Sequence, residues 1–188
     1  ITISPTNELT VDCYVDADFA GLWKIEDEQE PISVKSRSGH LIMFMGCPLS
    51  WQSKLQTQIA LSTMEAEYIA LSLAMRELIA LREILKEIQL NVFHDPSTKP
   101  SYKTICRGFV PQSKVYEDNA ACLKFASMPK MSPRTKHIAI PYHFFRTKVE
   151  ELEIKVIAVD TKSQLADQFT KGLPTAKFEY DRKLLMGW

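Results

Sequence analysis

The hydrophobic pattern in the first third of the chain predicts three β-strands. Val11, Cys13 and Val15 alternate with polar side chains, which is the period of two expected of a half-buried strand. Two β-prone runs follow, and a Gly-Cys-Pro turn between them predicts a hairpin. The three predicted strands cover residues 10–16, 40–45 and 49–54. The charged stretch at 21–38 predicts a long loop.

A long amphipathic helix is predicted next. Ser62 opens a segment that contains no Gly or Pro until past residue 90, and its apolar residues recur at helical spacing. Ser62 and Glu65 match a capping box, in which Glu65 would accept the backbone N–H of Ser62. The pattern predicts a helix from residue 63 to about residue 89.

The second half of the chain alternates short strands and helices. A proline-containing stretch at 91–113 predicts a linker or insertion. Gly172 and Pro174 predict the end of the last helix. The predicted strands are 114–117 and 154–159, and the predicted helices are 118–126, 136–152 and 163–171. This order predicts an α/β fold.

Composition narrows the class of protein. A chain of 188 residues with 45% hydrophobic and 24% charged residues is typical of one soluble domain. The chain contains no membrane-spanning run and no secretory signal. The absence of an initiator Met suggests a fragment of a longer chain. The four cysteines match no zinc spacing and are expected to be reduced thiols.

Four acidic motifs carry the candidate chemistry. Each places a carboxylate where a strand ends or a helix begins, so that the four can converge from distant elements. Divalent cations such as Mg²⁺ prefer oxygen ligands, and a pair of such ions clamps both oxygens of a phosphodiester displacement. The candidate ligands are Asp16, Glu67, Asp118 and Asp167.

Two glutamates compete for the second ligand position. Residues i and i+2 lie on different faces of a helix, so only one of Glu65 and Glu67 can face the metal. Glu65 has a capping role, and small residues follow Glu67 at i+3 and i+7. We predict Glu67, with Glu65 as the alternative.

Six short motifs in a fixed order carry a resemblance to a known family. They are DADFAG at 16–21, SWQSK at 50–54, ALSTMEAEY at 60–68, EDN at 117–119, RTKHI at 134–138 and QLAD at 164–167. Together they resemble the ribonuclease H domain of copia-type LTR retrotransposon Pol polyproteins. The resemblance extends over residues 10–183.

The resemblance implies a fold, an activity and a setting. The fold would be ribonuclease H-like, with a mixed five-stranded sheet flanked by helices. Residues 1–9 would be a leader, 10–183 the domain with insertions near 21–38 and 91–113, and 184–188 a tail. The enzyme would cut the RNA strand of RNA–DNA hybrids with two Mg²⁺ ions, for which Mn²⁺ would substitute. Its partner would be the reverse transcriptase domain of the same polyprotein, in a cytoplasmic virus-like particle.

A basic stretch between residues 124 and 148 predicts contacts to nucleic acid. It contains six lysines and arginines and no acidic residue between 123 and 149. A solvated face is the alternative for these charges. The candidate hybrid contacts are Lys130, Arg134, Lys136, His137 and Asn119.

Two other functions remain open from the sequence. One is a non-catalytic module that tethers reverse transcriptase or has been domesticated. The other is a different nuclease of the same fold. An integrase core would carry its Glu late in the chain, whereas here Glu67 comes second.

Overall fold

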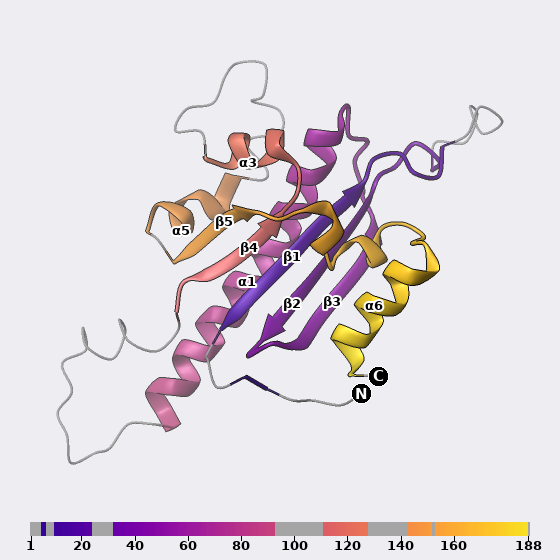
Figure 1. Ribbon diagram of the computed structural model, residues 1–188. Helices are drawn as coiled ribbons and strands as arrows, with labels where there is room; N and C mark the ends of the chain where they lie inside the picture. Colours follow the sequence, from indigo (N-terminus) through magenta and orange to yellow (C-terminus); the bar gives the residue numbers. More distant parts are fainter. Residues whose placement is uncertain are drawn as a thin grey trace, which may run out of the picture.

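A mixed five-stranded sheet forms the centre of the fold (Figure 1). The computed structural model describes residues 5–6, 10–23, 32–92, 111–127, 143–151 and 153–187. The strand order is β3-β2-β1-β4-β5. The strands are β1 (Val11–Asp18), β2 (Arg37–Phe44), β3 (Cys47–Leu55), β4 (Ser113–Glu117) and β5 (Ile154–Ala158). The predicted mixed sheet of five strands is confirmed.

The first three strands are antiparallel and the last two are parallel to β1. β1 pairs with β2 and β2 with β3 in antiparallel register, and the short turn between β2 and β3 is typical of such a hairpin. β4 pairs in parallel with both β1 and β5. β1 is therefore central, and its carboxyl end lies beside the carboxyl end of β4.

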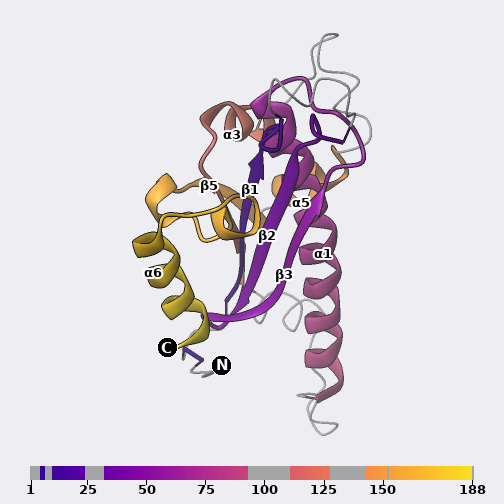
Figure 2. The same cartoon turned by 90° about the vertical axis from the view of Figure 1, so that its right-hand side faces the viewer.

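Helix α1 (Thr63–Val92) covers one face of the sheet (Figure 2). The alternating residues Val11, Cys13 and Val15 of β1 are buried against Ala70 and Ala74 of α1 in the main hydrophobic core. Small residues on the helix allow it to approach the strand closely. Helix α3 (Ala120–Ser127), the 3₁₀ turn η3 (His143–Phe145) and α5 (Arg146–Glu150) complete this layer.

Helix α6 (Thr175–Met186) lies on the opposite face of the sheet (Figure 2). A smaller core joins Leu185 of α6 to Leu41 of β2 and to Leu165. This helix is not predicted from the sequence, because Gly172 and Pro174 indicate the end of the last helix. It continues three residues past the predicted domain end at residue 183, and Gly187 ends it in the left-handed conformation that glycine tolerates (φ 76°).

The hairpin and the last predicted helix differ from expectation. The β2–β3 turn is formed by Met45 and Gly46, both with positive φ, and β3 already begins at Cys47. The predicted helix at 163–171 is wrong: the segment forms two 3₁₀ turns, η4 (Thr161–Ser163) and η5 (Asp167–Phe169). Gln164 between them has extended backbone, which interrupts a helix.

Several predicted segments lie wholly or partly outside the described residues. The linker prediction at 91–113 loses residues 93–110, and the helix prediction at 136–152 is described only from residue 143, where η3 and α5 occupy it. Within the described part of the chain, Cys13, Cys47 and Cys122 are free thiols. No described helix has the length and apolar character that crossing a membrane requires.

Candidate metal centre

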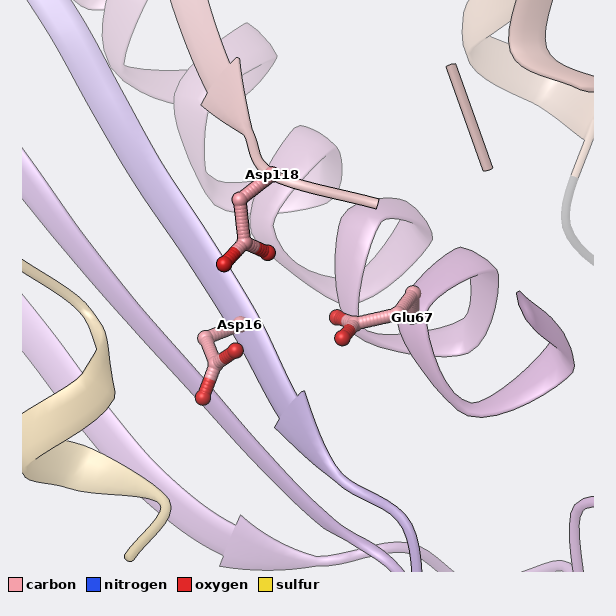
Figure 3. A group of neighbouring side chains, drawn as sticks. All are labelled: Asp16, Glu67 and Asp118. Atoms are coloured by element: carbon pink, nitrogen blue, oxygen red, sulfur yellow. The ribbon is translucent and has the colours of Figure 1, made fainter. Parts of the chain in front are cut away.

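Three carboxylates from three separate elements converge at the carboxyl ends of β1 and β4 (Figure 3). One carboxylate oxygen each from Asp16, Glu67 and Asp118 lies within 4.8 Å of the others. Asp16 comes from β1, Glu67 from the first turns of α1, and Asp118 directly follows β4. The structure therefore brings three of the four predicted ligands together.

Asp16 is held by the segment that follows η5. Its carboxylate accepts a hydrogen bond from the Thr170 hydroxyl, across 154 residues of sequence. Gly39 is paired with Asp16 in the sheet, and a Cβ there would lie 2.7 Å from the Thr170 methyl carbon. Glycine thus allows the segment to approach β2 closely. Burial raises the pKa of Asp16 to about 6, although Thr170 and Lys171 oppose the increase.

Glu67 and Glu65 have separate roles in the first turns of α1. Ser62 Oγ accepts the Glu65 N–H at 3.2 Å, while Glu65 Oε2 accepts the N–H of Leu61 at 2.9 Å. The Ser62 half of the predicted capping box is therefore present, and the Glu65 carboxylate reaches back to Leu61, the residue before Ser62. Glu67 points to Asp16 and Asp118 instead (Figure 3).

The environment of Glu67 disfavours its charged form. Its side chain is buried, and burial raises its pKa well above the usual range, with further increases from the charges of Glu117 and Asp16. One of its oxygens, Oε2, is buried without a hydrogen-bond partner. Such an arrangement is stable at neutral pH only if a proton or a cation neutralises it.

The Asp118 carboxylate is available to the cluster because its neighbours Glu117 and Asn119 make the local hydrogen bonds to the backbone. α3 begins at Ala120, two residues later than predicted, and Asn119 Oδ1 caps it by accepting the N–H groups of Ala121 and Cys122, both at 3.0 Å. Glu117 accepts the N–H of Asn119 at 3.0 Å. The capping role thus falls on Asn119 and not on Asp118.

Glu117 is a fifth carboxylate that the sequence analysis treated only as part of a motif. It is fully buried, and burial raises its pKa, with the charges of Asp118 and Asp16 adding to the effect. Its Oε2 atom is buried and has no hydrogen-bond partner. The alternation of side chains along β4 makes Ser113, Val115 and Glu117 the inward-facing residues, which is the signal that could have revealed it.

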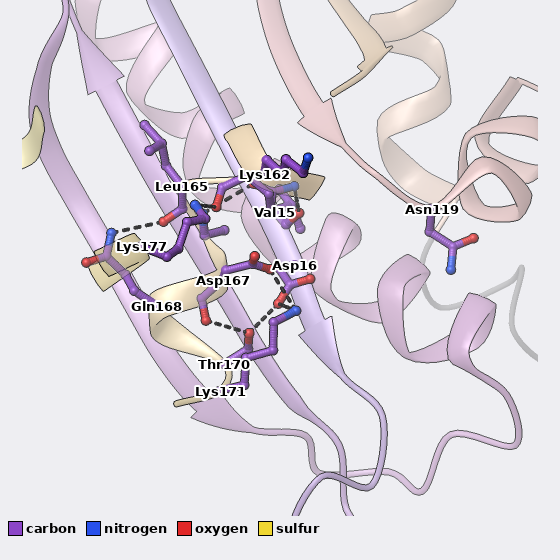
Figure 4. A network of polar contacts seen from close by, with 12 residues as sticks. Val15, Asp16, Asn119, Lys162, Leu165, Asp167, Gln168, Thr170, Lys171 and Lys177 are labelled. Atoms are coloured by element: carbon purple, nitrogen blue, oxygen red, sulfur yellow. Dashed lines mark hydrogen bonds and ion pairs between the residues drawn. The ribbon is translucent and has the colours of Figure 1, made fainter. Parts of the chain in front are cut away.

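Asp167 lies beside Asp16 but outside the group of three (Figure 4). Lys171 Nζ is 2.7 Å from Asp167 Oδ1 and 3.6 Å from Asp16 Oδ2. Both aspartates are buried, so this ammonium group offsets part of their negative charge where water cannot. Lys171 was not among the predicted site residues, although its i,i+4 spacing from Asp167 could have indicated the pair.

The donor set fits hard divalent cations. All of the converging groups are carboxylate oxygens, the ligand type that Mg²⁺ and Mn²⁺ prefer. The Oε2 atoms of Glu67 and Glu117 are buried without hydrogen-bond partners, so both are open to coordinate a cation. Among the described residues, no histidine or cysteine belongs to the group.

The predicted nucleic-acid contacts are almost all outside the described residues. This holds for Lys130, Arg134, Lys136 and His137. Asn119 is described, and its carbonyl oxygen is used in capping α3. Its predicted contact with nucleic acid stays a prediction.

Known proteins place the chain among transposon polyproteins. It is 35% identical over 172 residues to the retrovirus-related Pol polyprotein from transposon TNT 1-94 of Nicotiana tabacum, covering 92% of this chain and 11% of that polyprotein. The chain is homologous to a segment of retrovirus-related Pol polyproteins. The polyprotein from transposon RE2 of Arabidopsis thaliana is 30% identical over 185 residues, covering 98% of this chain and 11% of its own length. The predicted relationship is confirmed.

No family model matches this Pol-related chain. The N-terminal ribonuclease H domain of a Mycobacterium tuberculosis protein, solved as a fusion with maltose-binding protein, aligns with a TM-score of 0.49 at 11% identity, covering 94% of this chain and 98% of that one.

Proposed function

We propose that this chain is a ribonuclease H that hydrolyses the RNA strand of RNA–DNA hybrids during reverse transcription. The observation that carries the proposal is the convergence of Asp16, Glu67 and Asp118 within 4.8 Å in a chain related to Pol polyproteins. Because the chain spans about a ninth of those relatives, their reverse transcriptase region is its proposed partner. The proposed setting is a cytoplasmic virus-like particle.

Electrostatics support a metal-dependent reaction at this cluster. Both the carboxylates and a substrate phosphate are anionic, so the phosphate would be repelled unless cations lie between them. Asp16, Glu67, Asp118 and Asp167 would hold two divalent ions. When bound, such ions activate a water and stabilise the departing oxygen. The proposed products carry 5′-phosphate and 3′-hydroxyl ends.

The residues of the chain have separable tasks in this proposal. Thr170 keeps one oxygen of Asp16 oriented through its hydroxyl hydrogen bond. Lys171 supplies positive charge to Asp16 and Asp167 when no cation does. The rigid capping of α1 by Glu65 and of α3 by Asn119 keeps Glu67 and Asp118 in place.

A cleavage assay tests the proposed function directly. The substrate is an RNA–DNA hybrid with end-labelled RNA, incubated with Mg²⁺, Mn²⁺ or chelator. We expect cleavage of the RNA strand only with metal, and nearly complete loss in Glu67→Gln. Glu65→Gln is the matched control, because the same change two residues away keeps the helix cap. Cleavage in chelator, or equal losses in both variants, would refute the assignment.

The same assay separates this function from its alternatives. A tether module would bind hybrid without cutting it at any metal concentration. A different nuclease of this fold would cut DNA duplexes or junctions as well as it cuts the hybrid. Analysis of the cleaved ends for 5′-phosphate tests the proposed product chemistry.

The basic stretch is proposed to bind hybrid phosphates. Replacing Lys130, Arg134 and Lys136 with Ala should weaken binding of every hybrid sequence and lower the slope of log affinity against log salt by about 0.7–0.9 for each lost contact. Turnover at saturating hybrid should survive. A triple variant of exposed lysines elsewhere serves as the control; these are Lys54, Lys155 and Lys183. An unchanged slope would make the stretch a solvated face.

A further inference from the structure

Gln164 is a fully buried polar residue that belongs to no part of the carboxylate cluster. Its side-chain Nε2 donates to the carbonyl of Val15 at 2.9 Å and, more weakly, to the carbonyl of Tyr116 at 3.5 Å. Its Oε1 accepts the N–H of Ala166 at 3.2 Å. One amide group therefore joins three segments that are far apart in the sequence.

The position of this amide follows from the geometry of the sheet. The parallel pairing of β1 with β4 is limited to Cys13 with Val115 and Tyr14 with Tyr116. Beyond that point the Gln164 side chain bridges the two strands in place of backbone pairing. A buried carbonyl left without a donor costs about 1–3 kcal/mol, and this cost disfavours any other orientation of the amide.

Each partner of Gln164 lies within two residues of a candidate ligand. Val15 precedes Asp16, Ala166 precedes Asp167, and Tyr116 is two residues before Asp118. Val15, Asp16 and Asp167 lie close together (Figure 4). The side chain touches none of the carboxylates itself, so it acts on them only through the backbone.

We propose that Gln164 is a positioning residue that sets the spacing of the Asp16, Asp118 and Asp167 carboxylates for the divalent ions. This inference rests on the proposed function. The role requires two N–H donors and one acceptor on a side chain of this length. Glutamine meets that requirement, whereas an ionised Glu has only acceptors, and Met has no donor and only a weakly accepting sulfur.

The experiment measures metal affinity separately from stability. Mg²⁺ and Mn²⁺ are titrated calorimetrically into the unmodified chain without hybrid, and into Gln164→Met and Gln164→Glu. Gln164→Met keeps the approximate volume and removes all three hydrogen bonds. Gln164→Glu keeps the acceptor for Ala166 and removes both donors. We expect both variants to bind the ions about 10–100-fold more weakly, the range found for residues that orient metal ligands.

A matched control removes a buried hydrogen bond far from the cluster. Ser113 is fully buried at the start of β4, where its Oγ accepts from Arg82 at 2.6 Å. Ser113→Ala should lose unfolding free energy in urea but keep the metal affinity of the unmodified chain within about twofold. A general loss of stability would instead change metal affinity in all three variants.

The outcomes separate this inference from the proposed function. If the unmodified chain binds ions and both Gln164 variants bind them equally well, the positioning role is refuted while the ribonuclease H proposal stands. If the unmodified chain binds no divalent ion, both are refuted. If neither Gln164 variant folds, Gln164 is a core residue only and the inference is overturned.

Discussion

Glu67→Gln should stabilise the metal-free protein at neutral pH, even though it removes a proposed ligand. Burial, and then the charges of Glu117 and Asp16, raise the pKa of Glu67 far above its ordinary value of 4.5. Gln is neutral at every pH and keeps a carbonyl oxygen of similar shape. The substitution therefore removes the cost of ionising a buried carboxylate.

The sign and size of the expected change in unfolding free energy follow from proton linkage. Between pH 4.5 and the raised pKa, the folded protein holds a proton that the unfolded chain has released. The unfolding free energy of the unmodified protein therefore falls as pH rises, by at most about 1.4 kcal/mol per pH unit. Because neighbouring carboxylates share this effect, we expect Glu67→Gln to gain about 1–3 kcal/mol at pH 7.5 and almost nothing at pH 4.5.

Added metal should reverse the order of stability. At an ion concentration 100 times the dissociation constant, the unmodified protein gains about 2.7 kcal/mol, and Glu67→Gln loses most of that gain. Urea unfolding followed by circular dichroism, at pH 4.5 and pH 7.5 with chelator or Mg²⁺, measures the unfolding free energy of each protein under these four conditions. Glu65→Gln is the control and should behave like the unmodified protein, with no gain in stability at pH 7.5 in chelator and the same stabilisation by Mg²⁺.

One result would refute this reasoning. If Glu67→Gln in chelator at pH 7.5 is less stable than the unmodified protein, the carboxylate is stabilised by its surroundings and the cluster needs no cation. A gain that is equal at pH 4.5 and pH 7.5 would also contradict it, because the gain would then not come from ionisation.

Three other substitutions test separate parts of the structure. Gly39→Ala should reduce the unfolding free energy by about 1–3 kcal/mol and weaken metal binding, because its methyl group would push the segment after η5 off β2; calorimetry and urea unfolding measure both. Burial raises the pKa of Glu153, but hydrogen bonds from Lys86 and Lys148 lower it to about 2. The ionised Glu153 therefore adds to the unfolding free energy above pH 4.5, and this contribution is lost as the pH falls toward 2. Glu153→Gln should therefore lose about 1–3 kcal/mol at pH 7 and nothing near pH 2, and an equal loss at both would refute the ion pairs. Met45→Asn should raise the melting temperature through a gain of about 0.5–1 kcal/mol, since Met45 has a φ of 52° in the hairpin turn; a lower melting temperature would show that Met45 contributes contacts that outweigh this strain.

Local sequence patterns were sufficient to predict the strands and the long helix. Alternation at Val11, Cys13 and Val15, and the uninterrupted segment after Ser62, are local patterns that the structure reproduces to within a few residues. The same local logic separated Glu67 from Glu65, because helix geometry allows only one of them to face β1. These features depend on neighbours in the chain, which a single sequence displays.

The surroundings of the carboxylates depend on long-range contacts that local patterns do not show. The sequence predicted a helix at 163–171 that Gly172 and Pro174 would end, but the segment is extended at Gln164 so that its amide can reach the carbonyls of Val15 and Tyr116. Thr170 and Lys171 meet Asp16 across more than 150 residues, a contact that no local pattern encodes. Buried hydrogen bonds and charges contribute more free energy than the weak helix propensity of a short segment. The long-range contacts therefore determine the conformation of this segment.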